Sequence, residues 1–153
     1  MTRILFVCLG NICRSPMAEF ILKDMVAKEG LSDQFQIDSA ATSAEELGNP
    51  VYPPARRKLR EHGLICEGKT ARQISMADYA RYDYLIGMDN ANLQAMLRRF
   101  HGDPEGKLHL LLDYTDLPRD VADPWYTGDF TAAWNDIFAG CKGLLQFIRA
   151  EKE

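Results

Sequence analysis

The chain has 153 residues, of which 46% are hydrophobic and 26% charged, and its formal net charge is −4 at pH 7. A chain of this length usually forms one domain and can bury about 68–70% of its unfolded surface without a disulfide or a metal. We therefore expect residues 1–153 to be a single domain. The excess of 22 acidic over 18 basic residues argues against a protein that binds nucleic acid or a membrane surface.

The first residues and the cysteines bear on the compartment in which the protein works. The apolar run at residues 4–7 is too short for a signal peptide, and no apolar stretch reaches the ~20 residues that span a bilayer. We therefore expect a cytoplasmic protein, in which thiols stay reduced and do not form a disulfide framework. The four cysteines are Cys8, Cys13, Cys66 and Cys141.

The hydrophobic pattern of the first forty residues predicts a strand, a helix and a second strand. Residues 4–7 form a continuous apolar run, which is typical of a strand covered on both faces. Ser15 and Pro16 then predict an N-cap and a first helical residue, and Gly30 predicts the end of that helix. Residues 35–39 alternate between apolar and polar, which predicts a second strand.

Strands and helices continue to alternate in the rest of the chain. The pattern predicts a polar helix over residues 54–62, a strand over 84–87, a helix over 93–100 and a strand over 108–111. A long acidic loop over residues 112–130 leads to a closing helix. The predicted apolar stripe of that helix consists of Trp134, Ile137, Phe138, Cys141, Leu145 and Ile148.

This alternation of strands and helices predicts the fold class. Strands that alternate with helices pair in parallel through right-handed crossovers. We therefore expect a single α/β domain with a four-stranded, parallel, twisted sheet and helices on both of its faces. Ligands of such folds bind beyond the carboxyl ends of the strands. The loop after the first strand, residues 8–15, is therefore the first candidate site.

Residues 8–15 have the properties of a phosphate-binding loop that joins the first strand to the first helix. The unpaired amide N–H groups at a helix start, with their partial positive charge, attract an oxyanion such as phosphate. Gly10 and Asn11 are residue types that accept the positive φ that a tight curl requires. Arg14 adds a guanidinium group that matches two oxygens of a tetrahedral oxyanion.

Cys8 stands six residues before Arg14, at the end of the predicted first strand. A helix N-terminus and a nearby arginine favour the thiolate, which is the nucleophilic form of cysteine. The field that holds a phosphate would therefore also activate a nucleophile beneath it. Ser15 could donate a hydrogen bond to the sulfur and ease its later departure from phosphorus. A metal site at Cys8 and Cys13 fits less well, because their spacing is not C-x2-C and no nearby ligand completes a set.

Hydrolysis of a phosphate ester also needs an acid for the leaving oxygen and a base for the attacking water, and one carboxyl group can serve as both. Position alone leaves four candidates in the acidic loop, which are Asp113, Asp116, Asp120 and Asp123. Pro124 restricts Asp123 to extended conformations, which would give its carboxyl group a fixed direction.

Residues 7–16 resemble the phosphate loop of the low-molecular-weight protein tyrosine phosphatases. Further segments similar to this family are residues 38–43, 71–74, 88–89 and 123–126. The resemblance implies one α/β domain that hydrolyses phosphotyrosine and small aryl phosphates through a cysteinyl-phosphate intermediate. It implies that Cys8 is the nucleophile, that Arg14 binds the phosphate and that Asp123 is the general acid and base.

The resemblance also implies which residues shape the phosphate loop. They are Leu9, Gly10, Asn11, Ile12, Cys13 and Ser15, with Ser39 in a supporting position. In the family, the serine side chain helps to hold the asparagine and thereby the loop. The sequence alone favours an ordinary turn residue for Asn11 and an ordinary strand-end residue for Ser39.

Two aromatic residues and a second cysteine complete the site that the resemblance implies. Trp125 and Tyr126 match positions that wall the substrate pocket, although the family commonly has two tyrosines there and Trp125 could instead pack on the core. Cys13 matches a cysteine that protects the nucleophile by reversible oxidation. Alternatively, Cys13 has no chemical role and is simply a small buried side chain. Pro53-Pro54 stand where many members have an acidic residue, so we expect a different pocket wall on that side.

Three other functions fit parts of the pattern. An arsenate reductase on the same fold needs further cysteines near the third strand, and residues 82–92 contain none. A protein arginine phosphatase tends to have threonine where this chain has Ile12, which favours phosphotyrosine. A non-catalytic phosphate-binding module would not need a thiol beneath the anion. We expect a metal-independent enzyme without a cofactor, which acts on tyrosine-phosphorylated proteins as a monomer with at most weak self-association.

Overall fold

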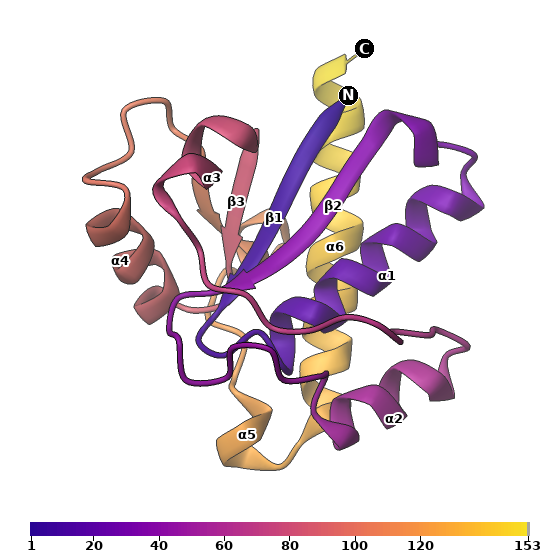
Figure 1. Cartoon of the computed structure of the whole chain (residues 1–153). Helices are drawn as coiled ribbons and strands as arrows, with labels where there is room; N and C mark the ends of the chain where they lie inside the picture. Colours follow the sequence, from indigo (N-terminus) through magenta and orange to yellow (C-terminus); the bar gives the residue numbers. More distant parts are fainter. Residues whose placement is uncertain (153) are drawn as a thin grey trace.

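Four parallel strands form the centre of the molecule (Figure 1). The computed structural model describes residues 1–152. The strands are β1 (Thr2–Cys8), β2 (Phe35–Ala41), β3 (Tyr84–Gly87) and β4 (Leu108–Leu110), and their order in the sheet is β2-β1-β3-β4. The predicted α/β fold with a four-stranded parallel sheet is therefore confirmed, although the last strand ends one residue earlier than expected.

Helices cover both faces of this sheet. They are α1 (Arg14–Lys28), α2 (Pro53–Glu61), α3 (Met76–Arg81), α4 (Asn90–Arg99), α5 (Pro124–Thr127) and α6 (Phe130–Lys152), with short 3-10 turns η1 (Ser32–Gln34) and η2 (Leu111–Tyr114). The hydrophobic pattern did not predict α3, although Ser75 and Asp78 form a capping box at its start. The pattern predicted a loop over residues 112–130, whereas that segment contains the end of η2 and the whole of α5.

The start of α1 differs from the prediction. Ser15 is not the N-cap and Pro16 is not the first helical residue, because α1 begins at Arg14 and is preceded by Cys13. The Ser15 side chain faces the Cys8 sulfur and therefore does not cap the backbone. Pro16 is tolerated as the third residue of the helix, because the N–H groups of the first turn have no partner within the helix.

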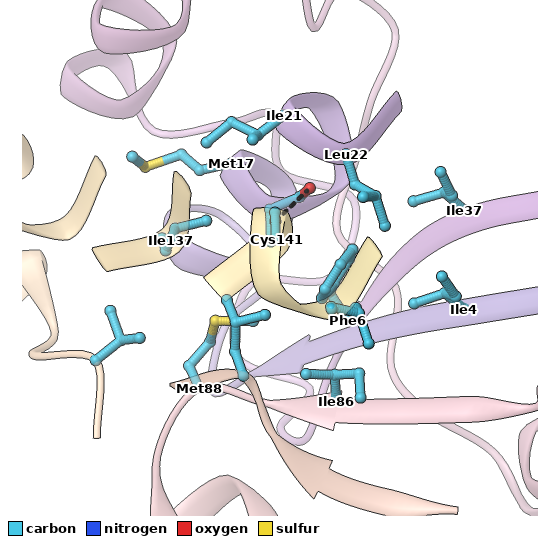
Figure 2. Packing of buried hydrophobic residues seen from close by; sticks show 14 of the residues in the cluster. Ile4, Phe6, Met17, Ile21, Leu22, Ile37, Ile86, Met88, Ile137 and Cys141 are labelled. Carbon is cyan, nitrogen blue, oxygen red and sulfur yellow. Dashed lines mark hydrogen bonds between the residues drawn. The ribbon is translucent and has the colours of Figure 1, made fainter. Parts of the chain in front are cut away.

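Two layers of buried side chains hold the helices against the sheet. On one face, α1 and α6 pack against side chains of β1, β2 and β3, and Figure 2 shows Phe6 lying between Cys141 of α6 and Ile86 of β3. The Cys141 thiol donates a hydrogen bond to the Ala18 carbonyl oxygen at 3.7 Å. The other face carries a second cluster of buried residues, which is made by Leu5, Val7, Ala40, Ile74, Tyr82, Leu85, Met96, Phe100 and Leu108. The apolar run of β1 thus supplies both layers, as the sequence predicted.

The predicted stripe of α6 is buried except at one position. Phe138 is 45% exposed, which makes its assignment to the core wrong, and Ala133 and Leu144 face the core although the stripe did not include them. The α6 helix also approaches η2 very closely. A Cβ atom at Gly140 would lie 2.4 Å from Cγ of Leu111, and one at Gly143 would lie 2.0 Å from the Tyr114 carbonyl oxygen. Only glycine fits at these two positions.

The carboxyl ends of the strands meet at one end of the molecule, where α1 begins and α5 lies (Figure 1). The N-terminus and the end of α6 lie at the opposite end. None of the helices within residues 1–152 has the length and apolarity needed to cross a bilayer.

Candidate active site

The loop between β1 and α1 curls around the sulfur atom of Cys8, which is only 3% exposed. The backbone N–H groups of Asn11 and Ser15 point to Cys8 Sγ at 3.3 and 3.4 Å, and the Ser15 hydroxyl lies 2.9 Å from it. Asn11 has a φ of 58°, the left-handed conformation that the sequence predicted for this curl. Three donor groups therefore surround one sulfur atom.

The side chain of Asn11 holds the loop in this shape. Its Nδ2 atom donates to Ser15 Oγ at 2.8 Å and to Ser39 Oγ at 2.9 Å, and its Oδ1 atom accepts from the Arg72 N–H at 3.3 Å. The structure thus contains the Asn11–Ser39 contact that the resemblance implied. Because Asn11 already donates to the Ser15 oxygen, the Ser15 hydroxyl proton is free to point at the Cys8 sulfur.

A buried carboxylate lies behind Ser39, and the sequence analysis missed it. Glu19 is 3% exposed, and its Oε1 atom accepts a hydrogen bond from Ser39 Oγ at 2.6 Å. Lys69 Nζ lies 3.0 Å from the same carboxylate oxygen and also donates to the Ser39 carbonyl. Lys23 pairs with the other oxygen at 2.6 Å. The signal in the sequence was a single charge among the otherwise apolar residues 16–22 of α1.

Arg14 is buried and held by three acceptors. Its Nη1 atom donates to Asp89 Oδ2 at 2.8 Å and to the Val121 carbonyl at 2.7 Å, and its Nη2 atom lies 3.5 Å from Asp123 Oδ2. Burial alone would lower the pKa of Arg14, but the nearby Cys8 and the two aspartates raise it above its ordinary value. The guanidinium group therefore stays charged.

Asp89 was not among the predicted site residues, although its position in the sequence makes it a candidate. It follows β3 by two residues and so lies at the carboxyl edge of the sheet, where ligands of this fold bind. Its Oδ1 atom caps α4 by accepting the Asn92 N–H at 2.8 Å, and its Oδ2 atom accepts from Arg14. One carboxylate therefore ties α4 to the phosphate loop.

Asp123 is the member of the four candidate aspartates that lines the same pocket as Cys8. It caps α5 by accepting the Trp125 N–H at 3.0 Å, and its backbone is extended, with φ −79° and ψ 112°. This conformation is the one expected before Pro124. The carboxyl group is therefore fixed near Arg14 and half-buried at the pocket wall.

Together these residues surround a pocket of about 120 Å³. Its walls are Cys8, Leu9, Gly10, Ile12, Cys13, Arg14, Glu45, Glu46, Asp123, Trp125 and Tyr126. The sequence analysis named all of these except Glu45 and Glu46, which lie in the loop after β2. Asn11, Ser15 and Ser39 lie behind the wall, where they support it.

Trp125 and Tyr126 stand at the pocket mouth and are 51% and 78% exposed. The Trp125 ring lies against Tyr52, with 4.7 Å between ring centroids, so it does not dock into the core. Pro53 and Pro54 open α2 directly after Tyr52. Many members of the family that the sequence resembles have an acidic residue in place of Pro53-Pro54. In this chain, the aromatic pair of Trp125 and Tyr52 stands beside the pocket on that side.

Cys13 lies in the same pocket but in a different environment from Cys8. It is buried, and this burial, together with the charges of Cys8 and Asp123, raises the pKa of its thiol far above the ordinary range. Burial likewise raises the pKa of Cys66 and Cys141. All four cysteines are free and buried. No cluster of three or more His, Cys, Asp or Glu side chains within residues 1–152 is arranged to hold a metal ion.

Comparison with known proteins gives consistent matches over nearly the whole chain. The sequence model of the family described as "Low molecular weight phosphotyrosine protein phosphatase" matches residues 3–153. The chain is 42% identical over 156 residues to the low molecular weight protein-tyrosine-phosphatase YfkJ of Bacillus subtilis, with 100% of this chain and 99% of that protein covered. The crystal structure of YfkJ matches with a TM-score of 0.96, covering 100% of this chain and 98% of that chain.

Two further relatives come from animals. The low molecular weight phosphotyrosine protein phosphatase of Mus musculus is 38% identical over 148 residues, which cover 94% of this chain and 93% of that protein. The crystal structure of a Drosophila arginine phosphatase is 35% identical with a TM-score of 0.85, and it covers 97% of this chain and 98% of that chain.

Proposed function

The chain belongs to the low molecular weight phosphotyrosine protein phosphatase family, and from this we propose that it hydrolyses phosphotyrosine with Cys8, Arg14 and Asp123 as its catalytic residues. The observation that carries the proposal is the environment of one atom. The Cys8 sulfur receives three donor groups at the base of a pocket whose walls also hold a guanidinium group and a carboxyl group. A thiolate is stabilised there, beneath the place where the loop amides and Arg14 can hold a phosphate.

In the first step, the Cys8 thiolate attacks phosphorus in line with the phenol oxygen. A sulfur–phosphorus bond forms and the phosphorus–oxygen bond breaks, while Asp123 gives its proton to the departing oxygen. The loop amides and Arg14 stabilise the charge on the three equatorial phosphate oxygens. Asp89 and the Val121 carbonyl hold the Arg14 guanidinium, so that little reorientation is needed on binding.

In the second step, Asp123 is a carboxylate and takes a proton from a water molecule that attacks the cysteinyl-phosphate. The sulfur–phosphorus bond breaks, and the sulfur leaves as a thiolate that the Ser15 hydroxyl stabilises by its hydrogen bond. Inorganic phosphate is released. Asp123 is protonated again and Cys8 is ionised, so the enzyme is ready for another cycle.

Cys13 has a separate role in this proposal, which is to protect Cys8 from irreversible oxidation. Peroxide converts the Cys8 thiolate to a sulfenic acid, which condenses with the Cys13 thiol to a disulfide and releases water. Both residues line one pocket, which supports this step. A reducing compartment such as the cytoplasm would restore the thiols. The proposed substrates there are tyrosine-phosphorylated proteins, on which the enzyme acts as a monomer.

Replacement of the nucleophile tests the assignment. We expect Cys8→Ser to abolish hydrolysis of p-nitrophenyl phosphate in metal-free buffer, because a serine hydroxyl is not ionised at neutral pH. Cys66→Ser, which changes another buried thiol, should keep the activity, and thermal unfolding of both variants shows whether the fold is retained. Full activity of Cys8→Ser would refute the mechanism.

A panel of phosphorylated peptides tests the substrate class. We expect hydrolysis of phosphotyrosine peptides and much slower hydrolysis of phosphoserine and phosphoarginine peptides, because Ile12 and the aromatic rings at the mouth suit a flat phenyl group. The 35% identity to the Drosophila arginine phosphatase makes phosphoarginine the alternative that most needs testing. A preference for phosphoarginine would replace the proposed substrate but not the proposed nucleophile.

A further inference from the structure

A groove of about 570 Å³ adjoins the catalytic pocket on the side of α4. Four residues line both the pocket and the groove, which are Leu9, Arg14, Asp123 and Tyr126. The remaining walls of the groove are Thr42, Asp89, Ala91, Asn92, Ala95 and Arg98. A polypeptide whose phosphotyrosine occupies the pocket therefore has a continuous path into this groove.

One face of α4 forms the outer wall of the groove. Ala91, Ala95 and Arg98 are spaced four and three residues apart, so they lie on the same side of the helix. The two alanines leave room for a bound chain. Arg98 is exposed and takes part in none of the ion pairs formed within residues 1–152.

The two guanidinium groups of the groove differ in their partners. Arg14 is neutralised by Asp89 and Asp123, whereas Arg98 has no carboxylate within ion-pair distance among the described residues. Glu45 and Glu46 line the pocket but not the groove, and they provide negative charge at the pocket wall. A bound substrate thus meets the unpaired positive charge of Arg98 in the groove and the negative charge of Glu45 and Glu46 at the pocket wall.

We propose that this groove is a subsite for an acidic side chain of the substrate, and that Arg98 is a specificity-determining residue that pairs with it. The inference rests on the proposed phosphatase function and adds a preference among phosphotyrosine sequences. The planar guanidinium group of Arg98 can form two parallel hydrogen bonds with an aspartate or glutamate carboxylate. An acidic side chain that instead approached Glu45 and Glu46 at the pocket wall would be repelled.

The expected size of the effect follows from the exposure of Arg98. A solvent-exposed ion pair contributes modestly, so we expect a preference of about threefold to fivefold in kcat/KM. The preference should weaken as salt is added, because exposed charges are screened over about 10 Å at 0.1 M salt.

The test uses phosphotyrosine peptides in which a single glutamate, glutamine or lysine is placed in turn at each of the three positions on either side. Wild-type enzyme should prefer glutamate over glutamine at positions on one side of the phosphotyrosine. Arg98→Ala should remove this preference, Arg98→Lys should keep most of it, and Arg98→Glu should reverse it in favour of lysine. Thermal unfolding of each variant confirms that the fold is retained.

Arg99→Glu is the matched control, because Arg99 is also exposed in the last turn of α4 but does not line the groove. Equal shifts for Arg98→Glu and Arg99→Glu would show a general charge effect and overturn the subsite. Absence of any glutamate preference in the wild type would also overturn it. Hydrolysis of p-nitrophenyl phosphate, which has no side chain to reach the groove, should be unchanged in all variants. Its absence in the wild type would instead refute the proposed function itself.

Discussion

The Ser15 hydroxyl oxygen lies 2.9 Å from the Cys8 sulfur while it accepts a hydrogen bond from Asn11 at 2.8 Å. The Ser15 oxygen accepts from Asn11 and keeps its own proton, which it donates to the sulfur when Cys8 is a thiolate and has no proton to give. The sulfur therefore receives a hydroxyl hydrogen bond as well as two backbone ones. Such a bond matters most when the sulfur carries a full negative charge, as it does when it leaves phosphorus.

We predict that Ser15→Ala slows breakdown of the cysteinyl-phosphate. A hydrogen bond to a charged group contributes about 1.5–3 kcal/mol, so kcat should fall by roughly 10- to 100-fold. Rapid-quench measurement with p-nitrophenyl phosphate should then show a burst of p-nitrophenol before the slow steady state. Ser15→Thr keeps a hydroxyl and should retain more of the activity. A kcat equal to that of the wild type would exclude this role.

We predict that Asp123→Asn separates good from poor leaving groups. Asparagine cannot donate a proton to the phenol oxygen, and the loss should be greatest for phenols that are weak acids. Measured kcat/KM across a series of substituted aryl phosphates should therefore depend more steeply on the acidity of the phenol in the variant. Asp116→Asn, in the same loop but outside the pocket wall, is the control. Equal losses for all leaving groups would argue for a purely structural role of Asp123.

We predict that Cys13→Ala makes peroxide inactivation irreversible. Wild-type enzyme treated with peroxide should regain activity when a thiol reductant is added, whereas the variant should not, because its Cys8 sulfenic acid has no partner and oxidises further. Since burial raises the pKa of the Cys13 thiol, this residue should resist alkylation at neutral pH when the unoxidised protein is treated. Cys141→Ala is the control, and identical recovery in wild type and Cys13→Ala would dismiss the protective role.

We predict that the hydrogen bond between Tyr82 and Asp38 stabilises the folded protein and that this stabilisation is lost at acidic pH. Burial alone would raise the pKa of Asp38, but hydrogen bonds from Tyr82 at 2.7 Å and Gln36 at 3.0 Å hold it below its ordinary value of 3.8. Burial and the same carboxylate raise the pKa of Tyr82 to about 12. A lowered carboxyl pKa stabilises the folded protein above the unfolded-state value, and this contribution disappears as the pH falls through the folded-state value.

Tyr82→Phe should therefore lower the free energy of unfolding by about 1 kcal/mol at pH 6 and by less at pH 3. Urea unfolding of both proteins at the two pH values measures this difference, and NMR titration should show a higher Asp38 pKa in the variant. Tyr126→Phe, at an exposed tyrosine, should show no such pH dependence. A difference that stays constant between pH 6 and pH 3 would contradict the assigned cause.

The regular parts of the fold follow from local patterns in the sequence. The continuous apolar run of β1, the alternation of β2 and the glycine after α1 each reflect interactions within a few residues, so their positions could be predicted. The start of α1 could not be predicted, because Ser15 has a tertiary partner in Cys8 that competes with its capping role. The short α5 helix depends on Asp123 as a cap. This capping signal could not be recognised within a long polar segment that offers several aspartates.

The site was predictable where its residues are adjacent in sequence and less so where they meet through folding. The phosphate loop carries its motif within residues 8–15, and Asp123 could be selected because a family resemblance extends to the following proline. Glu19 and Lys69 pair behind Ser39 across 50 residues of chain, and no local pattern announces such a pair. The groove at Arg98 depends likewise on how α4 lies beside the loop, which only the structure shows.

The close contact between α6 and η2 depends on two glycines that lie outside the pocket. Gly140 and Gly143 let the last helix lie against the turn from which the chain continues to Asp123. A methyl group at either position would push that turn away from the helix. The distance of closest approach between α6 and η2 is therefore limited by two hydrogen atoms, and larger residues there should lower the stability of the fold while every pocket residue stays unchanged.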